Sequence, residues 1–186
     1  GMCLKDPRYI EIPSRNSIAD QVEITVEGNF FDGMVMLSTC DSIVPGHLMA
    51  AARLDIPTIL VTGGYMPLGQ VRGREVLHIH AQDKVGTVQA GKMDWNEYDD
   101  LIAGSWGICG ACSSMTTANS MCMVAEAMGM TLPGNSTMSA VSSQLRHLSY
   151  QAGKRIVELV GNGITARQIM TPEAIENSPM MYELLW

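Results

Sequence analysis

Residues 30–64 follow a pattern of apolar run, helix-like segment and second apolar run. The two runs, FFDGMVMLST (30–39) and IPTILVTGG (56–64), are short and bounded by glycine, as is typical of buried strands. Between them, PGHLMAAARLD (45–55) starts with proline and is rich in alanine, which favours a helix. Two buried strands joined by a helix normally pair in parallel. The pattern therefore predicts an α/β fold with a parallel sheet flanked by helices.

Apolar spacing and capping residues predict further helices along the chain. The segment after the second strand, residues 65–93, is punctuated by glycine and charge, so we expect a loop with a short strand near 76–80. With 186 residues and no internal repeat, the chain is expected to form a single domain. The expected helices are 14–27, 94–105, 113–130, 143–163 and a short one that starts at Thr171-Pro172.

The charge pattern excludes some classes of partner. Twelve basic against nineteen acidic residues give a formal net charge of −7, and no run of Lys and Arg is longer than two residues. This argues against nucleic acid or an acidic membrane surface as the partner. Residues 1–10 hold no apolar signal core, and no apolar stretch approaches the roughly 20 residues of a membrane helix. We therefore expect a cytoplasmic protein whose cysteines are free, metal-bound or catalytic rather than disulfide-paired.

Cys40, Asp41 and Ser42 follow the first expected strand and precede the expected helix 45–55. Open α/β sheets bind ligands at this edge, where strand ends meet the positive ends of helix dipoles. A helix N-terminus also favours the thiolate form of a cysteine. A buried structural thiol is an equal alternative for Cys40, and a cap or turn residue is the alternative for Asp41.

Cys109 and Cys112 form a C-x-x-C pair directly before an expected helix. The spacing allows a redox dithiol, half of a zinc site or iron–sulfur ligation. His78 and His80 could complete a zinc site, but we expect these two imidazoles on one strand face or in a loop. Cys112 is expected in the cap region of the helix and Cys109 in the loop before it.

Two further cysteines and one further histidine are expected to have structural rather than ligand-binding roles. Cys122 lies on the apolar face of the expected helix 113–130, so packing is its expected role. His47 is expected on a helix surface, and Cys3 on the surface or in a linker.

Taken together, four segments resemble the dihydroxy-acid and sugar-acid dehydratase family. The family order is kept over nearly the whole chain. The two most specific segments contain the cysteines: CDSIVPGHLMAAARLDIPTILVTGGYM (40–66) and CGACSSMTTANSMCMVAEAMGMTLPGNST (109–137). The flanking segments are YIEIPSRNSIADQVE (9–23) and ITARQIMTPEAIENS (164–178).

The resemblance implies a hydro-lyase that converts a small 2,3-dihydroxy acid or sugar acid into a 2-keto acid. Family members use an iron–sulfur cluster, typically [2Fe–2S], held by three cysteines, with Mg²⁺ nearby, and are commonly homo-oligomers. The open iron acts as a Lewis acid on the departing hydroxyl. By position, Cys40 and Cys112 match cluster cysteines and Asp41 matches a magnesium ligand, with Ser42 and Cys109 as possible additions. Thiolates for iron and a carboxylate for magnesium agree with the preferences of these ions.

Three departures from the family pattern lead us to expect an inactive chain. Ser42 stands where the family has a lysine, which is modified to a magnesium-binding carbamate. A further cluster cysteine and an aspartate ligand would precede Gly1, and the C-terminal swivel-type domain, with its catalytic serine, is absent. Residues 1–186 are thus expected to be part of a dehydratase N-terminal domain without a stable cluster. The alternatives are a non-catalytic binding or assembly relative, and a zinc-binding α/β protein that uses Cys109 and Cys112.

Overall fold

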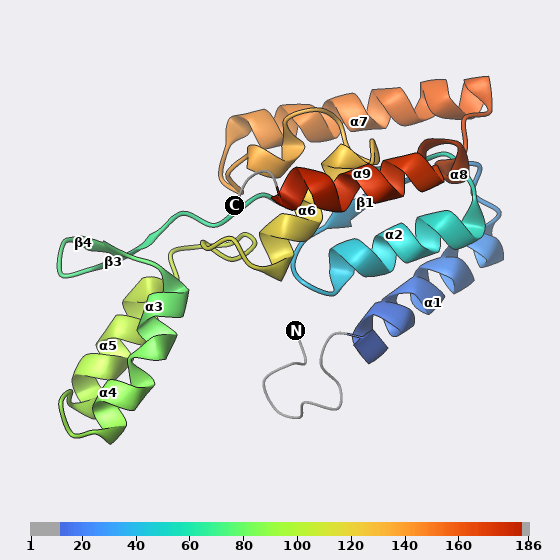
Figure 1. Ribbon diagram of the computed structural model, residues 1–186. Coiled ribbons are helices and arrows are strands. Elements are labelled where there is room, and N and C mark those ends of the chain that lie inside the picture. Colours follow the sequence, from blue (N-terminus) through green and yellow to red (C-terminus); the bar gives the residue numbers. More distant parts are fainter. Residues whose placement is uncertain (1–11, 184–186) are drawn as a thin grey trace.

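The computed structural model describes residues 12–183, and its centre is the expected strand–helix–strand unit (Figure 1). Strand β1 (Met34–Ser38) leads through helix α2 (Ile43–Leu54) into strand β2 (Thr58–Thr62). The strands pair in parallel, in a register that runs from Met34 opposite Thr58 to Ser38 opposite Thr62. The α/β fold with a parallel sheet flanked by helices is therefore confirmed.

Helices cover both faces of this small sheet. One face packs against α1 (Ile12–Asn29), α2, α6 (Thr117–Ala127) and α9 (Pro172–Glu183), and the other against α7 (Ser143–Asn162) (Figure 1). The strands supply this two-sided core by alternation, because successive side chains point to opposite faces. Met34, Met36 and Leu60 join the first layer, whereas Ile59 and Val61 join the α7 layer.

Residues 67–107, here called the lobe, project to one side of the sheet (Figure 1). The prediction of a loop with a strand near 76–80 is correct only in part, because the strand ends at Val76 and helices follow it. The chain turns at Arg72 and Gly73, whose φ angles of 50° and 76° suit the tight hairpin turn between paired strands. The lobe contains strands β3 (Gly69–Val71) and β4 (Arg74–Val76) and helices α3 (His78–Asp83), α4 (Val85–Gln89) and α5 (Trp95–Ser105).

The remaining helices lie where the sequence predicts them, and α6 is shorter at both ends than expected. Helix α5 begins after Asp94, whose side chain accepts from the Asn96 amide, and α7 ends at Gly163 in the left-handed conformation. Helix α6 begins at Thr117 rather than at residue 113, so Cys112 lies in a loop and not in the cap region. Outside the lobe, two short elements were not predicted: η3 (Asn135–Thr137) and α8 (Ala166–Ile169).

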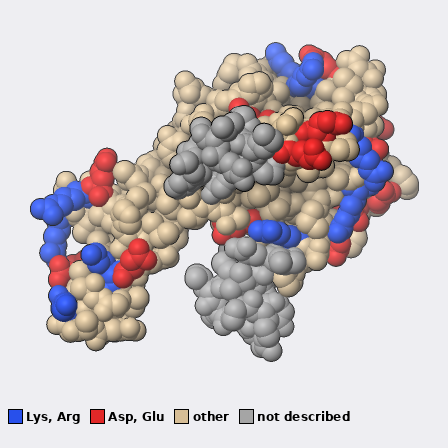
Figure 2. Space-filling model, in the orientation of Figure 1, with Lys and Arg blue, Asp and Glu red and all other residues tan. Residues whose placement is uncertain are grey.

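The surface shows no segregation of charge on the face seen in Figure 2, where basic and acidic side chains are intermixed on the lobe and on the body. Within residues 12–183, no helix is long and apolar enough to cross a membrane. Cys3 lies outside the described residues.

Candidate functional site

Cys40 lies just beyond the carboxyl end of β1, in a backbone conformation that is unusual for its residue type. Its φ angle is 82°, in the left-handed region, where residues other than glycine, asparagine and aspartate are uncommon. Its thiol lies 3.7 Å from Asp41 Oδ1, and the side chain is half-buried. A strained conformation of this kind is held only where the surrounding structure enforces it, and it is concentrated at functional sites.

Backbone pairing beyond β2 brings the second cysteine loop to the same edge of the sheet. The Ala111 amide donates to the Gly64 carbonyl, and the Met66 amide to the Ala111 carbonyl, both at 2.8 Å. Gly110 permits this approach, because its φ angle is 140° and a Cβ there would lie 2.6 Å from the Met66 nitrogen. Cys112 therefore follows directly after a segment that is pinned to the end of the sheet.

Cys40 and Cys112, 72 positions apart, lie close enough for their charges to interact. Burial is the main cause that raises the pKa of the Cys40 thiol, and the charges of Asp41 and Cys112 raise this pKa further. A hydrogen bond from the Asp41 backbone opposes the shift. Two thiols and a carboxylate thus share the carboxyl edge of the sheet.

His78 joins this group from the lobe. The prediction that it lies on a strand face or in a loop is wrong, because it is the first residue of α3. Its Nδ1 lies 3.0 Å from Ser113 Oγ, and its ring packs on Trp106 with the centroids 5.0 Å apart. Burial lowers the pKa of His78, against a smaller opposing effect of the Asp41 charge. His80 is exposed, so the two histidines do not share an environment.

The other predicted residues are placed as follows. Ser42 is the N-cap residue of α2, without a side-chain capping bond, and Cys109 is exposed in its loop. Cys122 is buried on α6, as its packing interpretation predicts. His47 is half-buried, with Nδ1 2.8 Å from Ser38 Oγ at the end of β1. The prediction of a helix-surface histidine is therefore wrong, because the side chain turns toward the sheet.

The side chains at this edge of the sheet supply only some of the ligands of an iron–sulfur centre. Among the residues that the structure describes, no three His, Cys, Asp or Glu side chains come together closely enough to hold a metal ion. The thiols of Cys40 and Cys112 are suitable iron ligands, but two thiolates are fewer than the three cysteines that the family resemblance implies. The described residues therefore match part of such a centre and do not complete it.

A cavity of about 540 Å³ lies beside the Cys112 loop. Tyr65, Ser113 and Ser114 are among the residues that line it. Ser114 Oγ is buried and has no hydrogen-bond partner among the described residues. A buried hydroxyl without a partner is costly to the fold.

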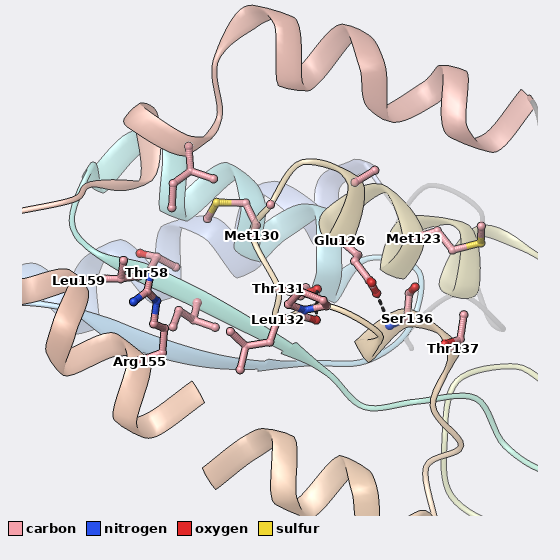
Figure 3. A pocket seen from close by; sticks show the side chains of 15 residues that line it. Thr58, Met123, Glu126, Met130, Thr131, Leu132, Ser136, Thr137, Arg155 and Leu159 are labelled. Atoms are coloured by element: carbon pink, nitrogen blue, oxygen red, sulfur yellow. Dashed lines mark hydrogen bonds between the residues drawn. The ribbon is translucent and has the colours of Figure 1, made fainter. Parts of the chain in front are cut away.

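A larger cavity, of about 710 Å³, lies between α6, α7 and the start of β2 (Figure 3). Its lining includes apolar side chains such as Met130 and Leu159, and none of the predicted site residues. The Glu126 carboxylate is engaged by the amides of Gly134 and Ser136, at 2.5 and 2.7 Å. We therefore place the candidate site at the smaller cavity and the two thiols.

Residues 4–184 match the family described as "Dihydroxy-acid/6-phosphogluconate dehydratase N-terminal". The chain belongs to this family. It is 46% identical over 176 residues to a dihydroxy-acid dehydratase of Methanothermobacter thermautotrophicus, a match that covers 95% of this chain and 32% of the relative. A dihydroxy-acid dehydratase of Methanosarcina barkeri is 44% identical over 170 residues, which are 91% of this chain and 31% of the relative. A dihydroxy-acid dehydratase of Clostridium pasteurianum is 44% identical over 167 residues, which are 90% of this chain and 58% of the relative. The chain thus spans about a third of the length of the first two relatives.

Sequence reasoning missed Asn119, which shapes the site. Its side-chain amide binds two carbonyls of the cysteine loop. The signal was the position of this asparagine in the first turn of α6, three residues after the cap at Thr116. From there, a short amide side chain can reach back to the preceding loop.

Proposed function

We propose that this chain is part of a hydro-lyase that removes water from a small 2,3-dihydroxy acid or sugar acid to give a 2-keto acid. Membership of the dehydratase family supports this, as do relatives named dihydroxy-acid dehydratases over most of the chain. The observation that carries the proposal is that the Cys40 loop and the Cys112 loop both lie at the carboxyl edge of the sheet, where Ala111 pairs with the backbone of Gly64 and Met66 just beyond β2. Parallel α/β sheets bind their ligands at this edge.

Within this proposal, Cys40 and Cys112 are ligands of an iron–sulfur cluster, of the [2Fe–2S] type, and Asp41 is a ligand of Mg²⁺. The division follows the chemistry of the donors, because thiolates suit iron and carboxylates suit magnesium. Ser42 and Cys109 stay possible additional contacts. Cys109 is the weaker of the two, because its exposed side chain is not drawn into the group.

The chain's own residues also suit a hydroxy acid. The cavity beside Cys112 is lined in part by the hydroxyl-bearing residues Tyr65, Ser113 and Ser114. Hydroxyl side chains can both donate to and accept from a polyol or its carboxylate.

We further propose that the protein acts in the cytoplasm as a homo-oligomer, with a small molecule rather than nucleic acid or a membrane as its partner. The isolated 186-residue chain is expected to be inactive, because two matched thiolates are fewer than the three of the family pattern. Turnover of a 2,3-dihydroxy acid or a sugar acid by the purified chain, after anaerobic reconstitution with iron and sulfide, would contradict this expectation.

The ligand assignment is tested by iron uptake. The chain is reconstituted anaerobically with iron and sulfide in the presence of dithiothreitol, which can supply missing thiolate ligands, and unbound iron is removed by desalting into the same dithiothreitol buffer. Because the chain alone is not expected to hold a stable cluster, we expect iron, sulfide and visible absorption only while dithiothreitol is present, in the wild type and in Cys109→Ser. Both signals should be lost in Cys40→Ser and in Cys112→Ser. Equal iron retention in all four proteins would overturn the assignment.

The same samples separate the alternatives. One zinc ion per chain that depends on Cys109 and Cys112 would favour a zinc-binding α/β protein. A wild type that takes up neither metal would favour a non-catalytic relative, for which Ser42 in the place of the family lysine is the supporting feature.

A further inference from the structure

His78 is the side chain through which the lobe reaches the cysteine loop. It lies at the point where α3 leaves the β3–β4 hairpin, and only 5% of it is exposed. Its ring packs on Trp106, at the other end of the lobe, where Trp106 and Leu68 form an antiparallel bridge. The imidazole therefore packs on one of the two chain segments that connect the lobe to the body, and that segment is bridged to the other one.

The polar edge of this imidazole faces the residue directly after Cys112. Nδ1 of His78 and Oγ of Ser113 lie 3.0 Å apart, within hydrogen-bond distance. The same loop is also held by Asn119, whose side-chain amide donates to the carbonyls of Cys112 and Ser114. Asn119 thus holds the main chain from α6, whereas His78 holds the Ser113 side chain from the lobe.

We propose that His78 is a positioning residue: by holding Ser113 it fixes the Cys112 thiol beside Cys40. This proposal rests on the proposed function in one respect, the identity of the group that the two thiols bind. The positioning of Cys112 by His78 does not depend on it. A short loop anchored at one side can still rotate about its main chain, and a second anchor on the opposite side removes that freedom. The placement of the thiol pair then depends on the lobe as well as on the sheet.

The experiment measures the reactivity of each thiol in the metal-free chain. Alkylation by iodoacetamide at pH 8 is followed by peptide mass spectrometry, so that Cys109, Cys112 and Cys122 are scored separately. The variants are His78→Leu, which removes the polar edge, Ser113→Ala, which removes its partner, and His78→Asn, which keeps a polar atom near the position of Nδ1. The matched control is His147→Leu, since His147 is an exposed histidine on α7.

We expect Cys112 to react about fivefold faster in His78→Leu and in Ser113→Ala, which is the population change for a lost hydrogen bond of ordinary strength. His78→Asn and His147→Leu should resemble the wild type. Exposed Cys109 and buried Cys122 serve as internal references whose rates should not change. The double variant of His78→Leu and Ser113→Ala should react no faster than either single variant, because one interaction joins the two residues.

Three results would overturn the proposal. The first is an unchanged Cys112 rate in both His78→Leu and Ser113→Ala. The second is a parallel rise at Cys122, which would assign His78 to general stability. The third is a His78→Asn protein that behaves like His78→Leu, which would assign the effect to ring packing. Because the chain carries no metal in this experiment, these outcomes are independent of the iron-uptake test of the proposed function.

Discussion

Asn119 holds the main chain of Cys112 from inside helix α6. Its Nδ2 donates to the Cys112 carbonyl at 2.6 Å and to the Ser114 carbonyl at 2.8 Å. Asn119 is buried, and both of its partners are oxygen atoms that can only accept. The position therefore demands a donor, which an amide provides and a carboxylate does not.

Replacing Asn119 with aspartate should be strongly destabilising. Asn119→Asp removes both donated hydrogen bonds and places a buried negative charge against two carbonyl oxygens, so we expect a loss of about 2–4 kcal/mol in the free energy of unfolding. Urea denaturation followed by circular dichroism measures this loss. Asn96→Asp is the matched control, because Asn96 is exposed in the first turn of α5, where an acidic residue is favourable. Equal losses in the two variants would contradict the anchoring role of Asn119.

Glu126 holds a second loop, residues 134–136, through a single side chain. In the wild type, each carboxylate oxygen of Glu126 accepts from one backbone amide, that of Gly134 or that of Ser136. Glu126→Gln keeps one of these acceptor oxygens and replaces the second with an NH2 group, which faces a backbone amide that is also a donor. We expect a loss of about 1–3 kcal/mol in stability, since charge-assisted hydrogen bonds are stronger than neutral ones.

The control for Glu126 is Glu158→Gln, which removes an exposed carboxylate paired with Arg155. Exposed ion pairs contribute little, so this change should cost less than about 1 kcal/mol. Both losses are measured by urea denaturation at pH 7. A larger effect at Glu158 than at Glu126 would show that the hydrogen bonds of Glu126 do not hold the loop.

The elements of the fold that could be predicted from the sequence are those with a local cause. The strands around residues 34–38 and 58–62 are short apolar runs, and α7 shows helical spacing with a cap at Ser142 and a glycine at its end. Two local signals were present and overlooked. The Arg72-Gly73 turn marks the hairpin of the lobe, and Thr165 with Gln168 forms the capping box of α8.

The site could not be predicted from local pattern, because its parts are assembled by distant contacts. Cys112 reaches the sheet edge through the bonds of Ala111 with Gly64 and Met66, which no spacing rule encodes. The delayed start of α6 has the same origin, since Asn119 takes up carbonyls that an earlier helical turn would have used. Resemblance to the family identified Cys40 and Cys112 as a pair; residue spacing alone left them as separate alternatives.

Gly110 tests the close backbone approach that places Cys112. Gly110→Ala would put a Cβ 2.6 Å from the Met66 nitrogen at a φ angle of 140°, so the loop must move. We expect a loss of about 2 kcal/mol or more in stability, together with faster alkylation of Cys112. Gly153→Ala is the control, because a Cβ there meets no atom within 4 Å and Gly153 lies inside α7. This second change should raise stability by about 0.5–1 kcal/mol, as alanine favours a helix over glycine. Similar stabilities for the two variants would contradict the close approach at Gly110.

Cys122 gives a pH dependence with a defined sign. Burial raises the pKa of its thiol from 9.0 to about 11. The unfolded chain therefore ionises this group first, and the stabilising contribution, complete below pH 9, is lost as pH rises toward 11. Over this range the free energy of unfolding of the wild type should fall by about 2–3 kcal/mol more than that of Cys122→Ala, which lacks the thiol. Urea denaturation at pH 8, 9, 10 and 11 measures the difference between the two proteins, so that ionisation of the other groups cancels. Parallel curves would mean that the thiol ionises equally in both states, in which case burial on α6 does not control its pKa.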